Sequence, residues 1–331
     1  MKKLGYMVNN QQRIAMETMR DAFIERLYDN MFVDDSIFFV TADLGAPALD
    51  KLRADFPDRF INVGIAEQNL INVSVGLALE GFKVYTYCIA LFLTLRAYEQ
   101  IRTSISMYTQ IRNLNINLIG VGIGLSYDVV GPTHHCLEDS CIMNVLPGFT
   151  IFTPSDSVMA GEFVAYTLAH PGPKYIRFDG KPQPDLYIPE NIIPFGDGFC
   201  EVRKGKDVCI ISTGYMTHLA LEIAERLVQD GISAGVVDHF FLKPFNEKKL
   251  LGILSRYKHI VTMEEAFINK GSLDSVIEHL CFSNRLFIGM TKFGFDDKYV
   301  FEVGDRKHLH RVNNLDQESI VNKIKLDFGE N

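Results

Sequence analysis

Short apolar runs alternate with amphipathic stretches along the first half of the chain. Five runs have the length and the β-branched and aromatic content of buried strands: residues 37–41, 84–87, 116–120, 150–153 and 175–178. Helical spacing of apolar residues predicts the first helix, one face of which is formed by Ala15, Met19, Ala22, Phe23 and Leu27. Another helix is predicted over 158–168, behind Ser155 and Asp156. Strands that alternate with helices predict a parallel sheet covered by helices.

Between residues 181 and 198 the chain becomes rich in Pro, Asp and Gly, which is typical of a linker. The alternation then resumes with predicted strands at 208–212, 236–239 and 260–263 and predicted helices at 219–227 and 247–254. We therefore predict an α/β protein with two domains, residues 1–185 and 186–331. Each is expected to be a mainly parallel sheet covered by helices.

The composition fits a globular protein, because 331 residues with 47% hydrophobic and 22% charged residues can form two full cores. No signal peptide follows residues 1–3, and no apolar run reaches the roughly 18 residues that a spanning helix needs. We therefore expect a cytoplasmic protein that does not enter the membrane. A net charge of -8 without a lysine or arginine cluster argues against nucleic acid as a partner.

Six cysteines are scattered through apolar segments, as expected for reduced thiols rather than a disulfide framework: Cys88, Cys136, Cys141, Cys200, Cys209 and Cys281. His134 and His135 lie close to Cys136 and Cys141 in the sequence and suggest zinc. A second ligand pair at a recognised spacing is lacking, so we predict no metal site on this chain.

One segment carries more specific chemistry. Residues 62–69 read Asn-Val-Gly-Ile-Ala-Glu-Gln-Asn and place Glu67 at the start of a predicted helix that ends at Gly81. The segment resembles the glutamate segment of the thiamine-diphosphate enzymes of the transketolase family. The resemblance extends over about residues 12–290 and matches the pyrimidine-binding and C-terminal domains of that family.

The resemblance implies a catalytic and cofactor-binding role for Glu67. In the family, the matching glutamate hydrogen-bonds a ring nitrogen of the cofactor's aminopyrimidine, so that the exocyclic nitrogen can take the proton of the thiazolium carbon. A poorly solvated setting suits this role because it raises a carboxyl pKa, and we expect Ile65, Ala66 and Leu70 to provide it. The alternative is a surface glutamate that complements the helix dipole.

Residues 88–102 resemble the split-transketolase pattern Ser-Thr-Phe-x-x-Phe-Leu-Thr-x-Arg-x-Tyr-Asp-Gln-Ile-Arg. In this register Phe92 matches the aromatic residue that packs on the aminopyrimidine. Ile89 replaces the first phenylalanine of the pattern and is expected to border the same cofactor pocket. Without the register, Phe92 would be an ordinary core residue.

Residues 131–135 resemble the family's Asp-Gly-x-Thr-His loop, in which the histidine approaches the reacting carbonyl and hydroxyls of the sugar. His134 takes this position, and an imidazole suits it because its pKa lies near neutrality. His135 is a second substrate-binding candidate, with the alternative that it binds backbone carbonyls of its own loop. Val130 stands where the family has aspartate.

A second departure from the family lies upstream in this loop. Gly122 aligns with a histidine that contacts the donor sugar, and Tyr127 and Asp128 are candidates to compensate for it. Because the usual hydroxyl partners are altered, the ordinary pentose-phosphate substrates are in doubt.

Two arginines are candidates for binding the sugar phosphate. Arg177 matches the family's phosphate-binding arginine, and a guanidinium fits phosphate oxygens in a bidentate way. Arg96 is a weaker candidate. The alternatives are a strand-edge salt bridge for Arg177 and an ion pair of Arg96 with Glu99 or Asp43.

The family's diphosphate-binding domain has no counterpart in this chain. That domain holds Mg²⁺ through a Gly-Asp-Gly motif followed after roughly 25 to 30 residues by Asn. Residues 196–198 read Gly-Asp-Gly, but they lie in the linker and the next asparagine is Asn246, so we predict a turn. The resemblance therefore implies a separate diphosphate-binding subunit that supplies the magnesium ligands, in an α2β2 heterotetramer.

Together these features predict the pyrimidine-binding subunit of a split transketolase-like transferase that uses thiamine diphosphate. It would move a two-carbon ketol unit between phosphorylated or activated sugars. The alternatives are a decarboxylative condensation like that of deoxyxylulose-phosphate synthase, the beta subunit of a 2-oxo-acid dehydrogenase, and a non-catalytic binding subunit. The identity of the sugars is not evident from the sequence.

Overall fold

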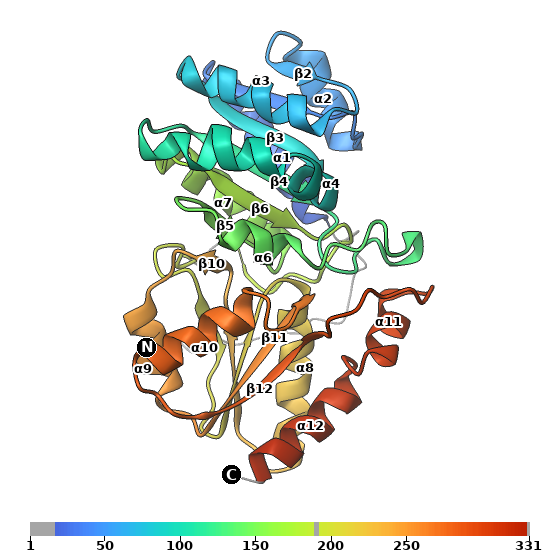
Figure 1. The fold of residues 1–331 in the computed structure, drawn as a ribbon, viewed down its shortest axis with the longest axis vertical. Helices are drawn as coiled ribbons and strands as arrows, with labels where there is room; N and C mark the ends of the chain where they lie inside the picture. Colours follow the sequence, from blue (N-terminus) through green and yellow to red (C-terminus); the bar gives the residue numbers. More distant parts are fainter. Residues whose placement is uncertain (1–16, 189–191, 330–331) are drawn as a thin grey trace.

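The computed structural model describes residues 17–188 and 192–329, which form two α/β units (Figure 1). The first unit is built on a seven-stranded sheet in the order β10-β5-β6-β4-β3-β1-β2, parallel except for β10. Its strands are β1 (Ile37–Thr41), β2 (Phe60–Asn62), β3 (Lys83–Ile89), β4 (Ile116–Val121), β5 (Thr150–Phe152), β6 (Lys174–Phe178) and β10 (Phe241–Lys243).

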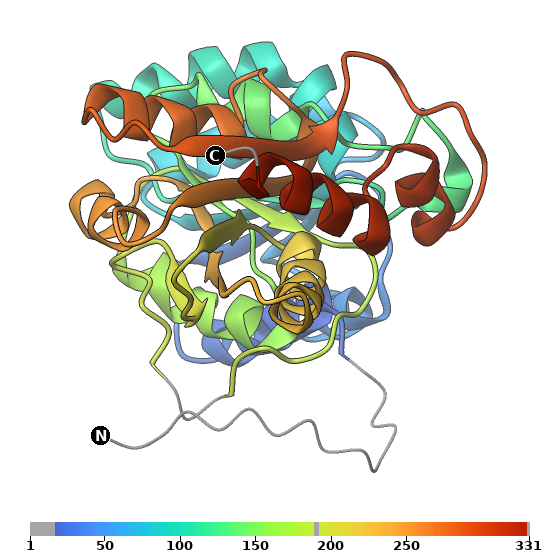
Figure 2. The ribbon, with the colours of Figure 1, turned by 90° about the horizontal axis from the view of Figure 1, so that it is seen from below.

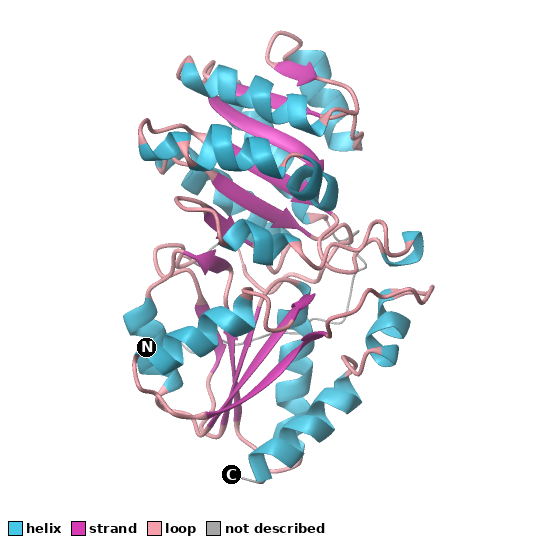
Figure 3. Ribbon diagram, viewed as in Figure 1, coloured by secondary structure: helices cyan, strands magenta, loops and turns pink. Residues whose placement is uncertain are grey.

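Helices cover both faces of this sheet (Figure 3). One face packs on α1 (Met19–Met31), α2 (Pro47–Asp55) and α7 (Ser157–Ala169). The other packs on α3 (Glu67–Leu79), α4 (Ala90–Arg96), the π-helix Ile101–Ser106 and α6 (Asp139–Asn144). Short helical turns also occur at α5 (Tyr98–Gln100), Tyr108–Gln110 and η3 (Asp128–Val130). Because side chains alternate along a strand, Phe39 joins the first apolar layer and Val40 the second.

The second unit has a five-stranded sheet in the order β12-β11-β8-β9-β7, in which only β7 is antiparallel. Its strands are β7 (Cys200–Arg203), β8 (Val208–Ser212), β9 (Ala234–Asp238), β11 (His259–Phe267) and β12 (Gly289–Phe295). Its helices are α8 (Tyr215–Gln229), α9 (Glu247–Leu254), α10 (Leu273–Ser283), α11 (Arg306–Val312) and α12 (Gln317–Gly329). Apolar side chains of α8 and α12 belong to one buried layer, and those of α9 and α10 to the other.

The predicted fold class is confirmed, and the strands predicted at 37–41 and 208–212 have the bounds of β1 and β8. The sequence analysis missed four strands: β2, β7, β10 and β12. All four lie at a sheet edge, where one side lacks a neighbouring strand and the apolar pattern is weaker. Ala15, which was predicted on the face of the first helix, lies outside the described residues.

A strand from the second half of the chain completes the first sheet. β10 pairs antiparallel with β5, with Phe241 opposite Phe152. The two units are therefore joined by backbone hydrogen bonds as well as by the linker. The boundary at residues 185 and 186 stays a prediction.

The predicted linker turn at residues 196–198 is confirmed, with Gly198 at a φ of 79°. The Asp197 carboxylate is held by Lys249 and by Asn246 Nδ2, the latter at 3.1 Å. Within the described part of the chain, none of the helices has the length and hydropathy to cross a bilayer.

Candidate functional site

The candidate site lies where three segments leave the carboxyl ends of neighbouring strands. Glu67 follows β2, Phe92 follows β3, and His134 lies in the segment after β4. β1 pairs with both β2 and β3, and β3 pairs with β4, so these three strand ends share one edge of the sheet. In open α/β sheets this edge is where ligands bind.

Glu67 begins α3 and points into the protein. It is 6% exposed and belongs to the buried stripe of α3 with Leu70, Ile71, Ser74, Val75 and Ala78. The predicted poorly solvated setting is therefore present around most of the side chain. Ile65 does not contribute to it, because its side chain is 76% exposed. Nearby, burial and then the Glu67 charge raise the pKa of the Cys88 thiol to about 12.

Arg96 binds Glu67, rather than Glu99 or Asp43 as the sequence alternatives had it. Its Nη1 donates to Glu67 Oε1 at 2.8 Å, and its guanidinium carbon lies 4.0 Å from the ring centroid of Phe92. The arginine side chain is half exposed. The planar guanidinium of Arg96 therefore lies against the Phe92 ring and donates a hydrogen bond to the Glu67 carboxylate at the same time.

The aromatic row continues from Phe92 to the substrate loop. The ring centroids of Phe92 and His134 are 5.3 Å apart with an interplanar angle of 69°, and Tyr127 lies 6.5 Å beyond His134. Ile89 is half-buried at the residue that precedes α4. The structure thus joins four predicted site residues, Glu67, Arg96, Phe92 and His134, through successive contacts. Such a row suits a planar nitrogen heterocycle next to a group that undergoes proton transfer.

His134 and His135 have different environments. His134 is partly exposed, and its Nδ1 lies 3.1 Å from Thr133 Oγ1. His135 is buried, and its Nε2 lies 3.3 Å from the backbone carbonyl of Asp128. This contact is the one expected from the loop-binding alternative for His135, and a role in substrate binding stays a prediction.

The Tyr127 ring fills the space beside Gly122, the residue that the resemblance aligns with a histidine. Gly122 has a φ of 89°, and a Cβ placed there would be 2.1 Å from Tyr127 Cε2. A Cβ at Gly180, on the other side of the ring, would be 2.8 Å from Tyr127 Cε1. Burial raises the pKa of Tyr127, with Arg20 opposing the shift, so its hydroxyl stays protonated at neutral pH.

Asp128, the other residue expected to compensate for Gly122, is turned away from the site. It is buried and accepts hydrogen bonds from the backbone amides of Val129 (2.8 Å) and Arg306 (2.7 Å), and it also pairs with Lys181. Val129 and Val130 are exposed on the same short helix. The loop therefore presents valine where a polar contact was expected.

Arg177 does not have the surroundings of a phosphate ligand in this structure. Its side chain is 2% exposed, and Nε and Nη2 both donate to Asp139 at 2.8 Å. Nη1 lies 3.0 Å from Thr153 Oγ1 and 3.3 Å from Glu264 Oε1. Every nitrogen of the guanidinium is engaged within the protein, as the salt-bridge alternative has it, and a role of Arg177 in phosphate binding stays a prediction.

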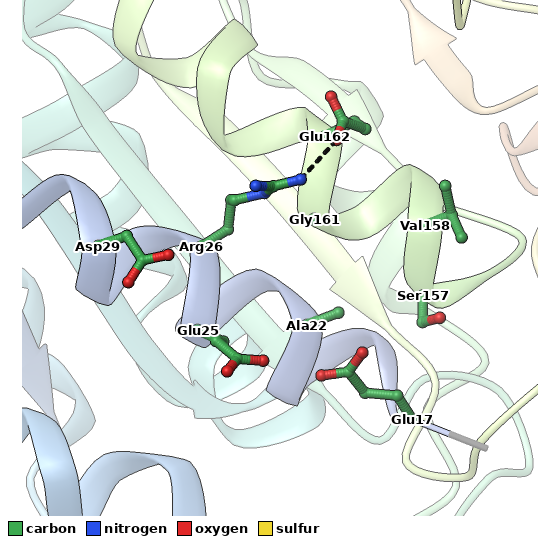
Figure 4. A pocket seen from close by; sticks show the side chains of 9 residues that line it. All are labelled: Glu17, Ala22, Glu25, Arg26, Asp29, Ser157, Val158, Gly161 and Glu162. Carbon is green, nitrogen blue, oxygen red and sulfur yellow. Dashed lines mark hydrogen bonds and ion pairs between the residues drawn. The ribbon is translucent and has the colours of Figure 1, made fainter. Parts of the chain in front are cut away.

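A separate hollow of about 230 Å³ lies between α1 and α7 (Figure 4). Four of its nine lining residues carry carboxylates, and Arg26 crosses it to Glu162 at 2.9 Å. None of the predicted site residues borders it. Within residues 17–188 and 192–329, no group of three His, Cys, Asp or Glu side chains is placed to hold a metal ion.

Comparisons with known families match both halves of the chain. Residues 15–181 match the family described as transketolase, pyrimidine binding domain. Residues 200–288 match the family described as transketolase, C-terminal domain.

Relatives and a solved structure extend the similarity over nearly the whole chain. The B-subunit of an apulose-4-phosphate transketolase from Actinobacillus succinogenes is 31% identical, covering 92% of this chain and 96% of the relative. The 6-deoxy-6-sulfo-D-fructose transketolase subunit SqwH from Clostridium sp. (strain MSTE9) is also 31% identical and is covered to 92% on both sides. A solved split gene transketolase, described as an inactive beta4 tetramer, is 30% identical with a TM-score of 0.84, covering 94% of this chain and 98% of that one.

Proposed function

This chain belongs to the transketolase family, and we propose that it is the pyrimidine-binding subunit of a split, thiamine-diphosphate-dependent transketolase. The observation that carries the proposal is the row formed by Glu67, Arg96, Phe92 and His134 at one edge of the first sheet. A pyrimidine-binding domain of this family implies thiamine diphosphate. The buried carboxylate and the adjacent aromatic face fit its aminopyrimidine, since the guanidinium of Arg96 already makes both kinds of contact.

Each site residue then has a defined task. Thiamine diphosphate supplies, when bound, the electron sink for carbon–carbon bond cleavage. Glu67 holds a shared proton at the aminopyrimidine ring nitrogen, and Phe92 packs on the ring face. His134 donates a proton to, or accepts one from, the sugar oxygens.

Arg96 has to leave this place when the cofactor binds, because the guanidinium uses both the Glu67 oxygen and the Phe92 face. Its half-exposed position allows a swing toward solvent without breaking the core. From there the released guanidinium is free to serve the substrate phosphate, as the sequence analysis proposed for Arg96.

We propose that a separate diphosphate-binding subunit holds Mg²⁺ and completes the site in an α2β2 heterotetramer. Two observations support this. The turn at residues 196–198 is engaged with Lys249 and Asn246, and the relatives include a transketolase B-subunit and a split gene transketolase. The substrate is proposed to be a ketose other than the ordinary pentose phosphates. Gly122 and Val130, which stand where the resemblance places a histidine and an aspartate, support this, as do relatives named for apulose 4-phosphate and 6-deoxy-6-sulfo-D-fructose.

The test is reconstitution. The chain is assayed for ketol transfer with thiamine diphosphate and Mg²⁺, alone and with a candidate diphosphate-binding partner from the same genome that carries the Gly-Asp-Gly…Asn motif. We expect activity only in the mixture. Full turnover by a rigorously purified isolated chain would refute the split-subunit proposal, and turnover of pyruvate with an aldehyde phosphate would favour the decarboxylative condensation instead. A mixture that binds the cofactor but turns over neither substrate class would favour a binding subunit.

A further inference from the structure

The second domain holds the loop that carries His134. Residues 122–137 leave the first sheet after β4 and close on themselves through two backbone hydrogen bonds of 2.9 Å between Gly124 and Cys136. In both views, the green segment with η3 runs beside α11 of the second domain (Figures 1 and 2). The loop is therefore placed to receive contacts from the second domain along its length.

Glu265 of β11 makes the first of these contacts. The backbone amide of Leu125 donates to Glu265 Oε2 at 3.0 Å, and both atoms are buried. The approach at Gly124 is so close that a Cβ there would lie 2.1 Å from the same oxygen. Glycine is therefore required at residue 124, where φ is also positive at 56°.

Arg306 of α11 makes the second contact and holds Glu265 at the same time. Its backbone amide donates to Asp128 Oδ2 at 2.7 Å. Its guanidinium binds Glu265 in a bidentate way, at 2.7 and 2.5 Å, and Asp179 at 2.6 Å. The ring of Tyr215 lies 3.7 Å beneath the guanidinium.

The charge of Glu265 is well stabilised in this setting. Burial alone would raise its pKa, but the Arg306 guanidinium and then His310, whose Nε2 is 2.6 Å from Oε1, hold the pKa well below its usual range. The hydrogen bond from Leu125 is therefore a charge-assisted one, which is stronger than a neutral bond. A third contact, from the Phe267 amide to the Leu137 carbonyl at 3.2 Å, fixes the far end of the loop.

We propose that Glu265 and Arg306 are positioning residues of the second domain that set the geometry of His134 over Phe92. Both act through other groups of the loop. Glu265 binds the backbone amide of Leu125, and Arg306 holds Glu265 and the Asp128 carboxylate. The structural part of the proposal stands on the contacts alone, and the catalytic part rests on the proposed function. Misplacing a catalytic group by about 1 Å is enough to lower a rate by about 100-fold.

The neighbouring residue provides a matched control. Glu264 is also buried on β11 and also binds an arginine, Arg177, but its other hydrogen bonds go to Ser272 and Leu273 rather than to the loop. The experiment compares Glu265→Gln with Glu264→Gln, each assembled with the diphosphate-binding partner. The readouts are amide hydrogen exchange of residues 122–137, cofactor affinity, and kcat and KM for the ketose.

We expect Glu265→Gln to speed exchange at Leu125 by at least about 10-fold and to lower kcat by about 10- to 100-fold. Cofactor affinity should stay within about two-fold of wild type, because Glu67 and Phe92 are not touched. Glu264→Gln should leave exchange in the loop at the wild-type rate. If Glu265→Gln does not fold, Arg306→Lys, which keeps the positive charge but not the bidentate geometry, is expected to give the same pattern in weaker form.

If Glu265→Gln and Glu264→Gln loosened the loop equally, the proposal would be overturned. The loosening would then come from weaker packing of the two domains in general, and not from the contact of Glu265 with the loop. The proposal would also be overturned if Glu265→Gln loosened the loop but kept the wild-type kcat. In that case the wild-type complex would still transfer the ketol unit, and the proposed function would stand. If the wild-type complex transferred no ketol unit, the proposed function would fail. Hydrogen exchange would then still decide whether Glu265 holds the loop.

Discussion

Two arginine–carboxylate pairs show how differently the candidate site and the boundary between the domains are built. Arg96 makes one hydrogen bond to Glu67 and leaves half of its side chain in solvent. Arg177 makes two bonds to Asp139 and further contacts to Thr153 and Glu264, and it is almost fully buried. Arginine is thus held loosely at the candidate site, where we propose that a ligand replaces it, and tightly at the domain boundary.

The energetics follow from burial. An exposed pair contributes about 0 to 1 kcal/mol because water and salt screen it. Removing one partner of a buried pair costs about 3 to 5 kcal/mol, because the other charge stays desolvated. Groups that move during function therefore belong at the site, while the domain boundary holds its charges in fixed contacts. The following variants test this contrast.

The largest effect is expected from Glu67→Gln. The amide keeps the size of the carboxyl but cannot supply the shared proton, so kcat should fall by about 1,000-fold, equivalent to about 4 kcal/mol in the barrier. The free energy of unfolding should change by less than about 1 kcal/mol, because the amide oxygen can still accept the hydrogen bond from Arg96, whose own side chain is half exposed. Proton exchange at the thiazolium carbon of the reconstituted complex measures the loss, and exchange at the wild-type rate would exclude Glu67 as the activating group.

Arg177→Ala should chiefly reduce stability. It leaves Asp139 and Glu264 buried without their cation, so we expect a loss of about 3 to 5 kcal/mol in the free energy of unfolding. Urea unfolding of the variant and of Arg96→Ala as the exposed counterpart gives the comparison. An unchanged urea midpoint with a raised KM for phosphorylated sugars would instead restore Arg177 as a phosphate ligand.

Gly122→His, which introduces the residue that the resemblance predicts at this position, should destabilise the protein by about 1 to 3 kcal/mol. The side chain would collide with the Tyr127 ring and would also require a positive φ. The double variant with Tyr127→Ala should recover the part due to the collision. Thermal unfolding of the two single variants and the double variant separates the terms, and an additive result would show that Gly122 and Tyr127 do not compete for space.

Arg96→Ala should give the smallest effect, and it should strengthen cofactor binding rather than weaken the protein. Removal of the competing guanidinium should increase the affinity for thiamine diphosphate by up to about 5-fold, equivalent to about 1 kcal/mol. Titration of the reconstituted complex, followed by tyrosine fluorescence or calorimetry, measures it. Weaker cofactor binding in the variant would mean that Arg96 supports the bound cofactor rather than giving way to it.

The sequence predicted the site residues that lie in local motifs. It did not predict contacts between segments that are distant in the chain. Glu67, Phe92 and His134 were placed by motifs on successive strand ends, and the structure brings them together. The buried contacts of Arg177 could not be read from the sequence, because they require Asp139 and Glu264, and Glu264 arrives only with the second domain.

Arg96 was linked to the wrong carboxylates because its partner lies 29 residues away on another helix. Helical spacing favours pairs within one turn, such as Glu99, and gives no signal for contacts between helices. Glu265 and Arg306 carried no catalytic motif at all. Their relation to the loop depends on how β11 and α11 approach residues 122–137.

The packing of Tyr127 between Gly122 and Gly180 has a consequence for how the substrate preference can evolve. A histidine at residue 122 is better tolerated after a smaller residue has replaced Tyr127, since the reverse order passes through a less stable protein in which the two side chains collide. The two positions are therefore epistatic, and the order of substitutions is constrained. Substitutions at Val129 and Val130 are free of this constraint, because both side chains are exposed.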